Sequence, residues 1–218
     1  MGRALGPTQD QDIFAFRADV RVATFPVPIT YKVEFGDFGG GDSQQFAQEG
    51  VMPLPHTSEF FKWIADSDAI VLVVDLGRYL MNPESRTQYV VKTTTGLRAT
   101  WQHFLDANED RRSRVRRHPL LLAFTKSDLL EFKNGGDDKF VQSEVSKWGF
   151  GVQVPKMHEV NTQVLFVEEE NVKNDFSSII RYFEGECSSF RVVFTSSFGL
   201  SNEKRLGLNE LMTAVLHR

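Results

Sequence analysis

Three continuous apolar runs of strand length constrain the fold of this 218-residue chain more than any other feature. They occupy residues 69–75, 120–125 and 190–195, and Val, Leu, Ile and Phe dominate them. Such runs are typical of strands that are covered on both faces, as in a parallel sheet. Helical patterns lie between the runs. The sequence therefore predicts an α/β fold with three layers, in which a mostly parallel sheet lies between helices.

Other patterns complete this single domain, which we expect to span residues 1–218. Residues 13–24 and 29–35 alternate apolar with polar side chains, which predicts an antiparallel hairpin at the edge of the sheet. Residues 206–218 predict a C-terminal helix, and residues 135–175 are interpreted as an insertion with a short helix or two. A further helix is predicted from Val90 onward by positions that share one face: Val90, Thr94, Leu97, Trp101, Phe104 and Leu105.

Composition excludes several classes of protein. The formal charge is −4, which gives no general attraction to nucleic acid, and no apolar run has the roughly 20 residues that a membrane span requires. A single cysteine, Cys187, excludes an internal disulfide and a thiolate zinc site. We expect a cytoplasmic protein that does not contact membranes unless it carries a lipid anchor.

Polar residues come directly after three of the expected strands, where ligands of open parallel sheets bind. The first group is Asp37-Phe38-Gly39-Gly40, in which the Asp suits Mg²⁺ and the glycines allow close approach of a phosphate. The second is Thr125-Lys126-Ser127-Asp128, whose carboxylate suits the two N–H donors of guanine while the lysine stem lies along the base. The third is Thr195-Ser196-Ser197, whose amides suit a base oxygen.

Each group also has a simpler interpretation. The glycines are equally typical of a tight turn that leaves a strand. Ser127 or Asp128 is a suitable cap for a helix that begins at Leu129. Thr195 to Ser197, taken alone, is an ordinary loop.

Taken together, and in their order along the chain, these three groups of residues after the strands resemble the signature elements of the Ras-like superfamily of P-loop GTPases. Asp37 to Gly40 is similar to the family's Asp-x-x-Gly element, Thr125 to Asp128 to its Asn/Thr-Lys-x-Asp element, and Thr195 to Ser197 to its Thr-Ser-Ala element. The double glycine is closest to Arf-type GTPases and heterotrimeric G-protein α subunits. Pro7-Thr8, followed by a strand, resembles switch I. The resemblance covers residues 7–132 and 189–218.

The resemblance implies a Ras-like G domain, with switch I and an edge hairpin in residues 7–36 and the switch II region in residues 37–65. It implies that GTP or GDP is bound with Mg²⁺, which Thr8 and Asp37 would hold. Gly40 would sense the γ-phosphate. The residues it implies for guanine recognition are Thr125, Lys126, Asp128, Ser196 and Ser197.

Two departures from the family concern its chemistry. The chain contains no Gly-x-x-x-x-Gly-Lys-Ser/Thr, so we expect the family's first strand, P-loop and first helix to be absent from it. Gly41 occupies the position of the Gln that orients the attacking water. Binding of GTP, GDP and Mg²⁺, and any GTP hydrolysis, would therefore depend on a P-loop supplied from outside this chain.

Three functional hypotheses remain open. The first is a guanine-nucleotide-binding switch domain, and the second is a pseudo-GTPase that serves as a protein-interaction scaffold. The third is an RNA or membrane-surface adaptor that uses the five arginines of residues 109–118, although such runs are usually solvated, as we also expect for Glu168 to Glu170. Because a missing first strand would expose its neighbours, we expect a protein partner: an effector, an activator or a second chain that completes the sheet.

Overall fold

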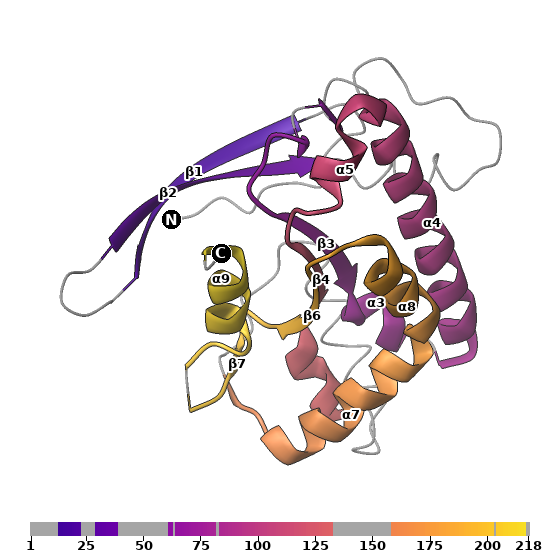
Figure 1. Cartoon of the computed structure of the whole chain (residues 1–218). Coiled ribbons are helices and arrows are strands. Elements are labelled where there is room, and N and C mark those ends of the chain that lie inside the picture. The colour runs from indigo at the N-terminus through magenta and orange to yellow at the C-terminus, as the bar shows by residue number, and fades with distance from the viewer. Residues whose placement is uncertain are drawn as a thin grey trace. The chain divides into compact units, whose positions relative to one another are not determined.

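The computed structural model of the chain describes residues 13–22, 29–38, 61–62, 64–81, 83–132, 158–202 and 204–216. The chain divides into two compact units, residues 1–52 and residues 53–218. Figure 1 shows the elements of both units. A single domain over residues 1–218 stays a prediction.

The first unit contains the predicted hairpin. Strands β1 (Ile13–Val22) and β2 (Ile29–Phe38) pair antiparallel in a two-stranded sheet. Strand β2 runs three residues further than expected, so Asp37 is paired with Phe14 inside the hairpin and does not lie beyond the strand. Lys32 is exposed and Val33 is partly buried, as the alternation predicts. That the hairpin extends the parallel sheet as its edge stays a prediction.

The second unit is built on the predicted parallel sheet. Strands β3 (Ile70–Asp75), β4 (Leu120–Thr125) and β6 (Phe190–Thr195) lie in the order β3-β4-β6, and both pairings are parallel (Figure 1). The bounds of β4 and β6 are those of the apolar runs, which confirms an α/β fold with a parallel sheet. Strands β5 (His158–Glu159) and β7 (Gly199–Leu200) form a short parallel pair.

The connections between the strands are mostly helical. None of the described helices combines the length and the hydrophobicity that are needed to cross a membrane. In chain order the described helices, in which η marks a 3-10 helix, are α3 (Leu76–Met81), η1 (Pro83–Ser85), α4 (Arg86–Ala107), η2 (Glu109–Arg111), α5 (Arg112–Val115), η3 (Ser127–Phe132), α7 (Thr162–Asp175), α8 (Ser177–Glu186) and α9 (Leu208–Leu216).

Helices cover both faces of the sheet. Ala214 of α9 packs with Leu121, Ala123 and Val193 on one face. On the other face the ring of Phe124 lies 5.2 Å from that of Phe176, between α7 and α8. Farther along this face, Trp101 of α4 contacts Phe183 of α8 edge-on at 5.7 Å. Large rings, most of them without polar atoms, therefore fill the interface between this face of the sheet and its helices.

Helix α9 leaves part of its face of the sheet open. The register places Val71 and Val73 of β3 beside Leu121 and Ala123, on the face that α9 covers. Yet Val71 is 38% exposed and Val73 is 61% exposed. Strand β3 is also the edge of the three-stranded sheet. The surface over β3 is thus an uncovered apolar strip at an open sheet edge, within the part of the chain that the structure describes.

The described part of the predicted insertion contributes to the core. Residues 135–157 lie outside the described residues, but α7 occupies residues 162–175 and buries Leu165 and Val172. The Asn161 side chain caps α7 by accepting hydrogen bonds from the amides of Gln163 and Val164, at 3.1 and 3.3 Å. This helix packs against η3, so it supports the residues that come after β4.

Three consecutive glutamates of α7, Glu168 to Glu170, differ in burial. The prediction that all three lie on a solvated face is wrong for Glu168. Glu168 is 1% exposed, Glu169 is half-buried and Glu170 is exposed. Burial raises the pKa of Glu169 to about 7. The positive charge of Lys173 lowers this pKa, whereas the negative charges of Glu210 and Glu170 raise it. The folded protein therefore binds a proton at Glu169 more tightly than the unfolded chain does.

Glu169→Gln is expected to stabilise the protein at pH 8 and to change little at pH 4. Because the pKa is raised on folding, the wild type loses stability as the pH rises from about 4.5 to about 7, by roughly 2–3 kcal/mol. Urea unfolding at both pH values measures the difference. Glu170→Gln is the matched control, since Glu170 is exposed and pairs with Lys173 at 2.7 Å. Equal effects of the two variants at pH 8 would contradict this account.

Candidate functional site

The three parallel strands end level with one another at the carboxyl edge of the sheet. Asp75, Thr125 and Thr195 are paired in register across β3, β4 and β6, and each is the last residue of its strand. The residues just beyond β4 therefore lie between those just beyond β3 and those just beyond β6. Two of the predicted groups, Thr125 to Asp128 and Thr195 to Ser197, meet at this edge, which is where ligands of open parallel sheets bind.

Lys126 is held in an unusual geometry one residue beyond β4. Its φ is 59°, a left-handed conformation that costs a residue other than glycine about 1–2 kcal/mol. Its ammonium pairs with Asp75 Oδ2 at 2.9 Å, and Asp75 Oδ1 accepts the amide N–H of Gly77 at 2.8 Å. Backbone strain of this kind is concentrated at functional sites.

The aliphatic stem of Lys126 lies close to Gly77. A Cβ at Gly77 would be 3.2 Å from Lys126 Cδ and 3.0 Å from Asp75 Oδ1, so a side chain here would press on the ion pair. The glycine therefore leaves room for the lysine to turn back toward β3.

Asp128 and Ser127 are buried at the start of η3. Asp128 is 1% exposed and Ser127 is 0% exposed, and the Ser127 hydroxyl has no hydrogen-bond partner among the described residues. The amide of Leu129 donates to the carbonyl of Lys126 at 3.1 Å. The first turn is thus closed by the backbone, and the Ser127 hydroxyl does not cap it.

The loop after β6 closes over Asp128. A Cβ at Gly199 would lie only 2.6 Å from Asp128 Cβ, so the backbone of Gly199 packs on the Asp128 side chain at a distance that only glycine permits. The amide of Leu206 donates to the carbonyl of Gly199 at 3.3 Å. A planar base would reach the Asp128 carboxylate only after Gly199 shifts.

The two serines of this loop differ in what they offer a ligand. Ser196 Oγ accepts the amides of Phe198 and Gly199, both at 3.0 Å, and its own amide donates to Leu206 O at 3.0 Å. Ser197 is exposed, and no hydrogen bond of the described residues uses its N–H, while the Arg205 guanidinium donates to its carbonyl. Ser197 is therefore the donor that remains for a base oxygen, whereas Ser196 shapes the turn.

The candidates for metal binding and hydrolysis are not brought to this edge. Thr8, Gly40 and Gly41 lie outside the described residues, and Asp37 is described only by its backbone in β2. Within the described ranges, no group of three or more His, Cys, Asp or Glu side chains suits a metal ion. The Asp128 carboxylate offers the two acceptors that the N–H donors of a guanine base need, but it is buried beneath Gly199. The residues present do not fit a triphosphate, since the sequence supplies no glycine-rich loop with a lysine.

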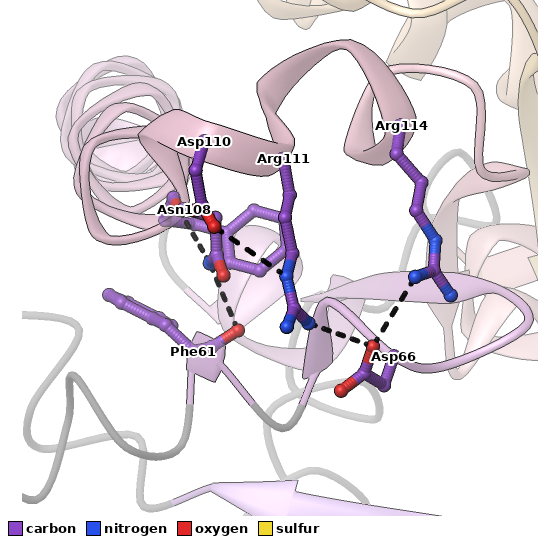
Figure 2. A network of polar contacts seen from close by, with 7 residues as sticks. Phe61, Asp66, Asn108, Asp110, Arg111 and Arg114 are labelled. Atoms are coloured by element: carbon purple, nitrogen blue, oxygen red, sulfur yellow. Dashed lines mark hydrogen bonds and ion pairs between the residues drawn. The ribbon is translucent and has the colours of Figure 1, made fainter.

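The arginine-rich segment lies at the opposite end of the strands, just before β4. Figure 2 shows Arg111 and Arg114 converging on Asp66, at 3.0 and 3.6 Å from its Oδ1. Asn108 is buried beside them and donates to the carbonyl of Phe61 at 3.1 Å. These contacts join the end of α4 to the segment that precedes β3.

Two further arginines are paired within the chain. Arg112 contacts Asp106 and Arg116 contacts Glu186, both at 2.8 Å. The segment forms η2 and α5, and α5 buries Val115. Because four of the five arginines already face carboxylates of this chain, the structural interpretation of the segment is favoured over an RNA or membrane adaptor.

Two cavities lie away from the strand ends. One of about 440 Å³ is bordered by α4 and the junction of α7 and α8, with Arg86, Thr94 and Asp175 among its lining residues. The other, of about 430 Å³, lies between α7, α8 and the start of β6. Neither cavity is lined by a residue that is predicted to bind guanine. The candidate site is therefore identified by the residue types at the strand ends and not by the volume of a cavity.

Asp75 and Gly77 are the site residues that the motifs do not single out. The signal for Asp75 is positional, because it is the acidic residue that ends the apolar run of residues 69–75. Its partner is 51 residues away along the chain, so only folding reveals the pair. Comparison with models of known protein families and with curated proteins finds no significant match to this chain.

Proposed function

We propose that this chain is the guanine-nucleotide-binding switch domain of a small-GTPase-like, cytoplasmic protein. One observation carries the proposal: the register of β3, β4 and β6 brings Thr125 to Asp128 beside Ser196 and Ser197 at the carboxyl edge of the sheet. These are the residues that the resemblance assigns to guanine. Their meeting at one edge supports a common ligand.

Each residue has a distinct part in the proposed recognition of guanine. The Asp128 carboxylate accepts the two N–H donors on one edge of the base, and the Lys126 stem lies along the face of the ring. The exposed amide of Ser197 donates to the base oxygen. Thr125 ties the end of β4 to β3, because its Oγ1 donates to Val74 O at 3.4 Å, and Ser196 shapes the turn after β6, because its Oγ accepts two amides of its own loop.

The phosphate end of the nucleotide depends on residues outside this site. We propose that a P-loop from outside this chain cradles the phosphates, with Thr8 and Asp37 holding Mg²⁺ and Gly40 sensing the γ-phosphate. When bound, Mg²⁺ would neutralise the negative charge of the phosphates. Because Gly41 has no side chain, the water-orienting group for GTP hydrolysis would also come from a partner.

We propose that a protein partner completes the sheet beside β3. This proposal rests on the open edge of β3 and on the exposure of Val71 and Val73, which are 38% and 61% exposed. A strand-and-helix unit would satisfy the unpaired strand edge and cover the two valines. An effector or activator is the alternative occupant.

Binding of nucleoside monophosphates to the full chain tests the base site without requiring a P-loop. We expect guanosine monophosphate to shift the amide NMR signals of Lys126 to Leu130 and of Ser196 to Gly199, whereas adenosine monophosphate leaves them unchanged. The affinity is expected to be millimolar, since a site of this kind lacks the phosphate contacts. Equal shifts with both nucleotides, or none with either, would remove the guanine-site proposal.

A pseudo-GTPase scaffold is the second candidate function. The observation in its favour is that Asp128 is 1% exposed and lies under Gly199, so the carboxylate meant for guanine is covered. In a scaffold, the buried acid and its loop would only stabilise the strand ends. The same titration separates the two functions, because a scaffold gives no guanine-specific shifts.

A further inference from the structure

We infer that Asp75 is a positioning residue that sets Lys126 for contact with the nucleobase, an inference that rests on the proposed function. The Lys126 ammonium contacts Asp75 Oδ2 at 2.9 Å, across the neighbouring strand end. Both side chains are about one-third exposed, at 35% and 32%, so the pair lies at the surface of the site and not in the core. No motif of the sequence assigns a role to Asp75.

Asp75 is itself held rigidly. Its Oδ1 accepts the Gly77 amide at 2.8 Å, which fixes the side chain against the turn into α3. Its backbone carbonyl accepts the hydroxyl of Tyr89 at 2.9 Å, which ties the end of β3 to α4. Because hydrogen bonds hold both the side chain and the backbone of Asp75, its carboxylate is a fixed anchor for the long side chain of Lys126.

The anchor changes what Lys126 presents to a ligand. A free lysine stem samples many rotamers, and ordering it on binding lowers affinity. Here the ammonium is neutralised by Asp75 and the stem passes Gly77, where a Cβ would be 3.2 Å from Cδ and 3.4 Å from Nζ. The part of Lys126 left for a flat base is therefore its apolar stem, already ordered.

Asp75→Asn tests the inference because it keeps the shape and the acceptor for the Gly77 amide while it removes the charge that holds Lys126. We expect the affinity of the full chain for guanosine monophosphate to fall about fivefold, as for the ordering of one flexible side chain on binding. Melting temperature is expected to be unchanged. The matched control is Asp66→Asn, which removes the ion pairs to Arg111 and Arg114 at the other end of the strands.

A double variant of Asp75 and Lys126 shows whether Asp75 acts on affinity through Lys126 or by loosening the whole site. Lys126→Met keeps an apolar stem without the ammonium, so in the Asp75→Asn background it is expected to cost no further affinity. Additive losses would overturn the inference, as would an unchanged affinity in Asp75→Asn. If the wild type shows no guanine-specific binding, the proposed function fails and the inference fails with it; if the wild type binds and Asp75→Asn binds equally well, the inference alone fails.

Discussion

Gly207→Ala is expected to lower the free energy of unfolding by about 3 kcal/mol, the largest loss of stability that the structure indicates for a single methyl group. Gly207 has a φ of 64°, which side chains of L residues rarely adopt. A Cβ there would lie 1.7 Å from the carbonyl oxygen of Phe194, which is backbone and cannot move aside as a side chain would. Strain and overlap therefore act together at this position.

The consequences reach the candidate site through the same loop. The Ser196 amide donates to Leu206 O at 3.0 Å, and the Leu211 amide donates to Gly207 O at 2.9 Å. Gly207 thus joins the loop over Asp128 to the first turn of α9. Displacing it shifts both the cover of the site and the helix that packs on Leu121 and Val193.

Gly185→Ala is the matched control for this prediction. Gly185 lies in the last turn of α8, and nothing approaches its Cβ position within 4 Å. Alanine there is expected to be neutral or to stabilise the protein by about 0.5 kcal/mol, because it favours the helix. Denaturant unfolding of both variants provides the comparison. A Gly207→Ala protein as stable as Gly185→Ala would show that the described path of the loop is wrong.

Asp128→Asn is expected to reverse the base preference of the site. A carboxylate only accepts hydrogen bonds, which suits the ring N–H and amino group on one edge of guanine. An asparagine amide offers one acceptor and one donor, which suits xanthine, where an oxygen replaces that amino group. Sites built on such pairing reject the mismatched ligand strongly, so we expect a change in the guanine-to-xanthine ratio on the order of 100-fold.

Titration of wild type and Asp128→Asn with guanosine and xanthosine monophosphates measures this ratio. Because Asp128 is buried, the variant must also be compared with the wild type by denaturant unfolding. Asp66→Asn again serves as the control for an Asp-to-Asn change outside the site. The same preference for guanine in both proteins would mean that Asp128 does not contact the base.

Much of the α/β architecture is predictable from local sequence. Apolar runs predicted β4 and β6 with their observed bounds, because a strand covered on both faces needs apolar side chains at most of its positions. Helical spacing predicted α4, and Trp101 and Phe104 are buried as expected. The insertion over residues 135–175 stays a prediction, but the burial of α7 was not foreseen, because one of its buried positions is the charged Glu168.

The candidate site was predicted in part. The motifs indicated which residues come after β4 and β6, and the parallel register brings these groups together. They did not indicate that Gly199 covers Asp128, that Ser196 is occupied by its own loop, or that Lys126 turns back to Asp75. Each of these depends on where a separate strand ends.

The sequence alone determined the three strands of the parallel sheet, the hairpin, helices α4 and α9, and the chemical types of residue at the strand ends, because periodicity and turn residues act over a few positions. Only the tertiary structure decided which of those residues are accessible, paired or covered. Asp75 and Lys126 are 51 residues apart, and their ion pair exists because two parallel strands end in the same register. The exposure of Val73 likewise comes from the position of α9 over β6, not from its own apolar sequence.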